Sequence, residues 1–229
     1  MLILGIETST SVCSLALCTP DKLVCEWSVD NGLTHSEKMM PQLEIMLAQC
    51  NIDKKAITDI AISIGPGSFT GLRIGLAAAK TMAFALGINI TGVPTLKALA
   101  YNITAPSAIL SPMVDGQKGN VWQAAYIWLD GKIKELQPAQ LKSFSTVIKD
   151  LSGKQENVIL LGENIAPDAA LPQNITWAQP HLVMPRASSA ANAAIDKIMA
   201  KDTDDLFALT PYYMKKSEAE LLWEKKHNV

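Results

Sequence analysis

The chain has 229 residues, and its 20 basic and 22 acidic residues leave a formal net charge of −2. Charged residues make up only 18% and apolar residues 48%, which excludes a disordered tail protein, a coiled coil and a large basic surface for nucleic acid. This shortage of charge leaves two interpretations: an ordinary well-packed domain, or a chain that keeps apolar surface for a partner.

The first part of the chain predicts an antiparallel meander followed by a helix. The three predicted strands, joined by tight turns, are Leu2–Ile6, Val12–Leu17 and Leu23–Val29. Apolar residues then recur at helical spacing from Ser36, a candidate N-cap, to Cys50. Pro41 inside this segment predicts a late helix start or a kink.

Strands and helices then alternate. The predicted elements are a strand Ile60–Ile64, a loop Gly65–Gly71, a helix Leu72–Leu86 closed by Gly87, a strand Ile88–Val93, and a helix from Thr95 to about Asn102. This order of elements predicts a mixed α/β sheet with helices packed on it.

The pattern restarts near Thr104 and predicts a second, smaller domain. Its elements are a strand Ile109–Val114, a hairpin Val121–Leu129 and Ile133–Leu141 around Asp130-Gly131, a helix Ser145–Leu151, a strand Val158–Leu161, a loop-rich stretch 167–185 and a helix Ala187–Ala200. We therefore expect domains at 1–104 and 105–208. A tail, 209–229, with a helix at Ser217–Lys226, is expected to pack back on the first domain.

Nothing in the sequence predicts a membrane or secreted protein. The charge-free stretches Thr81–Leu96 and Ala98–Val114 are shorter than the roughly 20 residues of a spanning helix. No basic residue precedes Lys22, which argues against a signal peptide. The four cysteines lack metal-site spacing, so we expect reduced thiols and a cytoplasmic location.

The segment Gly65–Gly71 lies between a strand and a helix, where phosphate-binding loops are found. It lacks the Gly-Lys-Ser/Thr of a Walker loop, and Thr70 replaces the third glycine of a dinucleotide fingerprint. A nucleophile elbow around Ser68 would need glycine at Pro66 and Thr70. We interpret the segment as a tight turn with a helix cap, and assign this structural role to Gly65, Pro66, Gly67, Ser68, Thr70 and Arg73.

Small residues recur at every fourth position of the following helix, at Gly71, Gly75, Ala79, Ala83 and Gly87. Such a face lets another backbone approach closely, either the protein's own sheet or a second subunit. The preceding helix offers adaptable methionines for the same contact. The predicted partner interface comprises Met39, Leu43, Met46, Gly71, Leu72, Gly75, Ala79 and Ala83, so Gly75→Arg is expected to leave the monomer folded and abolish partner binding.

A few polar residues are candidates for a catalytic or metal-binding role. His35 has no histidine nearby in sequence, and we interpret it as a residue at the start of a helix. Glu7, Asp115 and Glu163 follow predicted strands, where acids act either as metal ligands or as solvated caps. These alternatives stay open on the sequence alone.

Several segments together resemble the TsaB (YeaZ) family, which is needed for threonylcarbamoyl modification of the tRNA adenosine beside the anticodon. They are residues 2–9, 35–37, the glycine-rich block 65–75, and Gly92-Val93. The resemblance covers roughly the first hundred residues. The second half departs from it, because Asp115-Gly116-Gln117 stands where the family has Asp-Ala-Arg, and Trp122 where it has tyrosine.

The resemblance implies an actin/Hsp70/sugar-kinase-like fold of two ribonuclease-H-like domains, the second reduced. It also implies a paralogous partner, TsaD, which holds the metal and performs the transfer. Thr95 and Leu99 stand at the two positions of that partner's metal-binding histidines, and Glu7-Thr8-Ser9 replaces the Asp-x-Gly phosphate turn of related ATPases. The resemblance therefore implies a subunit with no catalytic, cofactor or metal residues of its own.

The implied partners are TsaD as a heterodimer, a TsaE-type ATPase joining the complex, a second copy when the chain is alone, and tRNA only indirectly. Three alternatives remain: an ATPase or kinase of the same fold, a metallopeptidase, and a direct tRNA-binding module. The last would use tail lysines that neighbouring glutamates largely offset.

Overall fold

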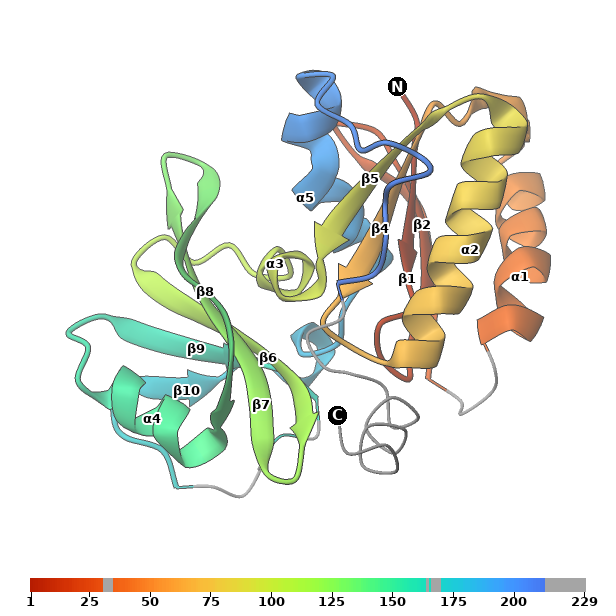
Figure 1. Cartoon of the computed structure of the whole chain (residues 1–229). Helices are drawn as coiled ribbons and strands as arrows, with labels where there is room; N and C mark the ends of the chain where they lie inside the picture. Colours follow the sequence, from red (N-terminus) through yellow and green to blue (C-terminus); the bar gives the residue numbers. More distant parts are fainter. Residues whose placement is uncertain (31–34, 164, 166–169, 213–229) are drawn as a thin grey trace, which may run out of the picture.

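The computed structural model describes residues 1–30, 35–163, 165 and 170–212 and contains two five-stranded mixed sheets (Figure 1). The first sheet has the strand order β3-β2-β1-β4-β5. Its strands are β1 (Ile3–Glu7), β2 (Cys13–Cys18), β3 (Leu23–Val29), β4 (Asp59–Gly65) and β5 (Asn89–Pro94). The first three are antiparallel and the last two run parallel to β1, so the predicted meander and mixed sheet are confirmed.

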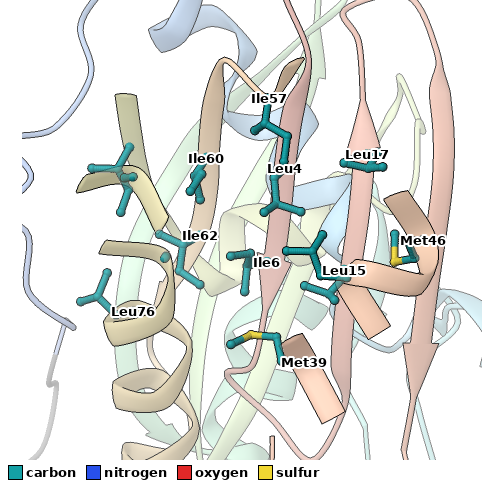
Figure 2. Packing of buried hydrophobic residues seen from close by; sticks show 14 of the residues in the cluster. Leu4, Ile6, Leu15, Leu17, Met39, Met46, Ile57, Ile60, Ile62 and Leu76 are labelled. Atoms are coloured by element: carbon teal, nitrogen blue, oxygen red, sulfur yellow. The ribbon is translucent and has the colours of Figure 1, made fainter. Parts of the chain in front are cut away.

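Two helices cover one face of the first sheet, α1 (His35–Gln49) and α2 (Phe69–Leu86). Alternate side chains of the central strands, among them Leu4, Ile6 and Ile62, point into this core and meet Met39 and Leu76 of the two helices (Figure 2). The other set of side chains on these strands is buried on the opposite face. Burial on both faces explains why the central strands are apolar throughout.

The second sheet repeats the topology of the first, with the order β8-β7-β6-β9-β10. Its strands are β6 (Ala108–Gln117), β7 (Asn120–Leu129), β8 (Lys132–Ser143), β9 (Asn157–Leu161) and β10 (Ile175–Trp177), and α4 (Phe144–Ser152) packs on it. The predicted hairpin is confirmed, since Asp130 and Gly131 both have the positive φ of a tight β-turn. Among the described residues no α-helix lies between β9 and β10, so this half is the smaller one.

Each half ends in a helix that packs against the other half. The first half ends in α3 (Thr95–Ala100), whose Leu96 and Leu99 are buried against the second sheet. The second half ends in α5 (Ala187–Met199), whose alanines pack on the first sheet, opposite α1 and α2. The two sheets are therefore joined by a reciprocal exchange of helices (Figure 1).

Close packing of α5 depends on small residues on both sides. A Cβ added at Gly5 of β1 would overlap the carbonyl oxygen of Ala187. Ala16 and Ala61 lie on the same face of the sheet and belong to the same cluster as Ala191. The helix thus approaches the strands more closely than larger side chains would permit.

A carboxylate on β3 holds the N-terminus of α5. One oxygen of Glu26 accepts a hydrogen bond from Ser188 N at 2.9 Å, and the other accepts from both Arg186 Nε, at 3.0 Å, and Arg186 Nη2. Ser14 Oγ on β2 accepts from Ala187 N at 3.1 Å. These contacts satisfy N–H groups that a helix leaves unpaired at its first turn.

The described C-terminal segment also lies on the first half. Asp204 forms a β-bridge with Ile90, and Tyr212 N donates to Ile64 O at 2.7 Å. Together with α5, this places residues from beyond position 186 on the sheet built by the first hundred. The division at 104 and 208 stays a prediction, and the predicted helix Ser217–Lys226 lies outside the described residues.

Several predicted boundaries are wrong for local reasons. Ser36 lies inside α1 rather than capping it, and α3 ends at Ala100, before the predicted end near Asn102. The helix α2 begins at Phe69, because Ser68 caps it three residues earlier than predicted. The stretch predicted as loop contains β10 and a 3₁₀ turn, Pro180–Leu182.

One described helix, α2, is long and apolar enough to span a membrane by length and composition alone. Six of its residues are buried within the chain, and Lys80 donates to the carbonyls of Phe207 and Leu209. Because a core helix meets the same criteria, this composition is weak support for a membrane segment.

We expect Glu26→Ala to lower the free energy of unfolding by about 2 kcal/mol, because it leaves Arg186 and the Ser188 N–H without their acceptor. Urea unfolding monitored by circular dichroism measures this. The control is Asp196→Ala, which breaks an ion pair with Lys132 whose side chains are both 68% exposed, and should cost no more than about 0.5 kcal/mol. Equal losses in the two variants would contradict the anchoring role of Glu26.

Candidate functional site

The turn between β1 and β2 meets the glycine-rich loop before α2. Ser68 N donates to Ser9 O at 2.6 Å, and a Cβ added at Gly67 would overlap the same carbonyl. Gly65 has φ +117°, and an added Cβ would lie 2.8 Å from Tyr212 O. The glycines of this loop are required by the close approach of two other backbone segments.

The start of α2 is fixed to the same turn. Ser68 Oγ accepts from Gly71 N at 3.2 Å, so the predicted helix cap is confirmed. Thr8 Oγ1 donates to Gly71 O at 2.9 Å. A Cβ added at Gly75 would overlap Thr8 Oγ1 and come within 3.3 Å of Ile62. Glycine at 75 is thus needed so that α2 can lie directly on β1 and β4.

A buried carboxylate lies below this turn. Glu7 at the end of β1 is fully buried; one oxygen accepts from Ser9 N at 2.6 Å and the other from Ser63 Oγ. Burial raises the pKa of the Glu7 carboxyl above its ordinary value, although the hydrogen bonds from Ser63 and Ser9 lower it. Glu7 is therefore not a solvated cap, and its oxygens are directed at the chain's own donors.

This geometry leaves little at the turn for a phosphate to bind. In a phosphate loop, main-chain N–H groups point at the ligand. Here Ser9 N is directed at Glu7 and Val12 N donates to Thr10 Oγ1 at 3.2 Å, while Ser9 O accepts from Ser68 N. Two N–H groups of the turn, at Ser9 and Val12, are thus engaged within the chain.

The other acids predicted at strand ends lie apart from Glu7. Asp115 is exposed and accepts from Gln117 N at 2.8 Å within its own turn. Burial, with a smaller contribution from Asp30, raises the pKa of the Glu163 carboxyl. Within residues 1–30, 35–163, 165 and 170–212, no three His, Cys, Asp or Glu side chains come together as a metal site. His35 is the first residue of α1, which confirms its predicted place.

The eight residues of the predicted partner interface are buried inside the chain. Met39 and Met46 of α1 pack into the core of the first sheet (Figure 2). Leu43 of α1 and Ala79 and Ala83 of α2 belong to the same core cluster, and Gly71, Leu72 and Gly75 are also buried. Of the two interpretations of the small-residue face, the structure supports packing on the protein's own sheet. The expectation that Gly75→Arg leaves the monomer folded is wrong, because even a methyl group at 75 overlaps Thr8.

The outer faces of the same two helices carry exposed apolar side chains. Met40 and Ile45 on α1 are 41% and 47% exposed, and Phe84 on α2 is 69% exposed. Arg73 is also exposed, and its guanidinium lies 3.9 Å from the centre of the Phe69 ring. A contact of α1 and α2 with another protein would use these residues rather than the predicted set.

The partners of the buried polar groups could not be predicted from the sequence. Ser63 lies 56 positions from Glu7, and Arg186 lies 160 positions from Glu26. Neither pair leaves a local pattern. The one available signal was a charged residue in an otherwise apolar strand, as at Glu7 and Glu26.

Comparison with known proteins gives a consistent result. The family model described as TsaD, tRNA N6-adenosine threonylcarbamoyltransferase, matches residues 32–223. The chain is 30% identical over 231 residues to the tRNA threonylcarbamoyladenosine biosynthesis protein TsaB of Bacillus subtilis, covering 97% of this chain and 98% of the relative. The protein with the same description from Escherichia coli is 30% identical over 129 residues, 55% of each chain.

Among solved structures, YeaZ from Pseudomonas aeruginosa superimposes with a TM-score of 0.78 and 20% identity, over 93% of this chain and 99% of that one. At this identity the likeness concerns the fold. It confirms the predicted fold class, two ribonuclease-H-like halves of the actin/Hsp70/sugar-kinase type with the second reduced.

We expect Gly75→Ala to lower the free energy of unfolding by about 1–3 kcal/mol, because the added methyl group overpacks the contact with Thr8. Adding Thr8→Ala should recover part of the loss, a coupling that a double-mutant cycle measures. Gly153→Ala is the control, since open space surrounds that position and its φ is −80°. A loss at Gly75 equal to that at Gly153 would contradict the close contact.

Glu7→Gln should stabilise the fold increasingly as pH rises above 4.5, the ordinary pKa of the carboxyl. Burial favours the protonated acid in the folded chain. The parent protein therefore loses stability as pH rises from the ordinary pKa of the unfolded chain to the raised pKa of the folded chain. Urea unfolding of both proteins over a pH series measures the difference. A difference that stays constant above and below pH 4.5 would show that burial does not shift this pKa.

Proposed function

The chain belongs to the TsaB (YeaZ) family of tRNA threonylcarbamoyladenosine biosynthesis proteins, and we propose that it serves this modification as a non-catalytic subunit bound to a TsaD-type transferase. In this role it supplies a folded surface that activates the partner, and the partner performs the transfer. Binding of a TsaE-type ATPase to the complex, pairing of two copies when the partner is absent, and a cytoplasmic location complete the proposal.

The observation that carries the non-catalytic role is the state of the β1–β2 turn. Ser9 N, which a phosphate-binding turn would direct at its ligand, instead donates to Glu7 of the same chain, and Ser9 O accepts from Ser68 N. The glycines of the following loop serve contacts within the chain. A nucleotide phosphate at this position would have to break these contacts.

A second observation supports the same role. Thr95 and Leu99, at the positions implied to be metal ligands in the partner, are fully buried in α3. Leu99 packs against the second sheet. Leucine has no atom that can bind a metal, and threonine is not among the usual zinc ligands.

The surface we assign to the partner is the outer face of α1 and α2. Met40, Ile45 and Phe84 are large apolar side chains exposed on these adjoining helices. Apolar side chains at the centre of an interface supply most of its stability once they are buried. The assigned surface lies on the two helices predicted from the sequence, but it consists of their exposed residues and not of the buried residues predicted.

We expect Ala77→Arg on α2 and Met40→Glu on α1 each to reduce co-purification with the TsaD-type transferase of the same organism at least about tenfold, through buried charge at the interface. Because both positions are exposed, the thermal midpoint of the isolated variants should stay that of the parent. Leu136→Glu, at a 52% exposed site on β8, is the control and should bind normally.

Normal co-purification of both helix variants would contradict the proposed surface. No co-purification of the parent chain, and no dependence of transferase activity on its presence, would contradict the proposed function itself. Calorimetry of the isolated chain with ATP and Mg²⁺ tests the catalytic alternative. Saturable binding there would show that the β1–β2 turn opens for nucleotide.

A further inference from the structure

The four cysteines of the chain fall into two classes by burial. Cys13 and Cys18 are buried in the first sheet, whereas Cys25 and Cys50 are half-buried. Burial raises the pKa of Cys13 to about 11 and of Cys18 to about 12, so both stay as unreactive thiols at neutral pH. Only the half-buried pair combines a thiol with access from solvent.

Cys25 and Cys50 lie on the same side of the first sheet. Cys25 on β3 pairs across the strands with Leu17 on β2, so both side chains face α1. Met46 of α1 belongs to the same core cluster as Leu17 (Figure 2). Cys50 is one helical turn beyond Met46, since Cys50 N donates to Met46 O at 3.0 Å. The end of α1 therefore brings Cys50 to the position of Cys25.

The position of Cys50 is fixed by the end of the helix. Asn51 has φ 54°, and its N donates to Ala48 O at 3.1 Å, while Ile52 N donates to Leu47 O at 2.9 Å. This pair of hydrogen bonds is the Schellman motif, which ends a helix in a defined conformation. Cys50 is the last residue before the left-handed turn and is not on a variable loop.

Cys25 and Cys50 both pack against the core of the first sheet, and the Cys50 thiol is close enough to contribute to the raised pKa of Cys25. Burial, then Cys50, and to a lesser degree Glu26, raise the pKa of Cys25. A thiol of this kind is slow to start an exchange reaction. Once in a disulfide it is also a poor leaving group, so that disulfide persists.

We propose that Cys25 and Cys50 form a reversible disulfide, a redox modification site that joins β3 to the end of α1. The oxidant is a low-molecular-weight disulfide such as glutathione disulfide. One cysteine thiolate attacks it, forming a mixed disulfide and releasing a glutathione thiolate that takes up the proton. The second cysteine then attacks the protein sulfur of that mixed disulfide and releases the second glutathione.

The balance is two protein thiols oxidised and one glutathione disulfide reduced to two glutathione thiols. The product closes a loop between positions 25 and 50 and constrains the unfolded chain. We therefore expect the oxidised protein to melt several degrees higher than the reduced one. This proposal does not rest on the function proposed above, because it concerns only contacts within the chain.

The test incubates the folded full chain with excess glutathione disulfide. The incubation lasts as long as the urea-unfolded chain needs to become oxidised under the same conditions. The expected product is lighter by two hydrogen atoms and carries no glutathione. Trypsin separates the candidates cleanly, since Cys25 lies in peptide 23–38, Cys50 in peptide 39–54, and both buried cysteines in peptide 1–22. We expect peptides 23–38 and 39–54 to be linked, and dithiothreitol to release them.

Three variants complete the experiment. Cys50→Ser should leave Cys25 unlinked or carrying a stable glutathione adduct, and Cys25→Ser should do the same for Cys50. Cys18→Ala, which removes a buried thiol, should still give the linked pair. Stable glutathione adducts on both cysteines of the parent, links through peptide 1–22, or thiols that stay free in the folded chain would each overturn the proposal.

Discussion

The exchange of helices between the two halves is the contact on which the rest of the structure depends. Each sheet needs a helix on its second face, and that helix comes from the other half of the sequence: α5 covers the first sheet and α3 the second. Glu26 fixes α5 by accepting from the Ser188 N–H and from Arg186. Because neither sheet is covered without the other half, we expect the two to fold cooperatively.

The same requirement for close packing governs the loop that most resembles an active site. Gly67 and Gly75 are small because Ser9 and Thr8 lie against them, and the main-chain groups of the turn are engaged in holding α2. A glycine-rich loop between a strand and a helix is thus used for packing. Ser9 N is directed inward at Glu7, and this observation is the basis of the non-catalytic role that we propose.

The helix α1 connects both proposals. Its inner face is buried in the core, its outer face carries Met40 and Ile45, and its C-terminal end places Cys50 on the same core cluster as Cys25. A disulfide there would fix the end of a helix that we assign to a partner surface. Since the chemistry of the thiols and the binding of the partner are measured separately, each can be judged without the other.

The sequence by itself determined the order of the strands and helices apart from β10, the hairpin at Asp130-Gly131 and the close of α2 at Gly87. These depend on periodicity, caps and turns, which act over a few residues. Only the tertiary structure decided that the small face of α2 lies on Thr8, that Glu26 holds α5, and that Cys25 and Cys50 pack on the same core cluster. Such contacts join residues far apart in the chain, and a side chain shows no local sign of the neighbour it will meet.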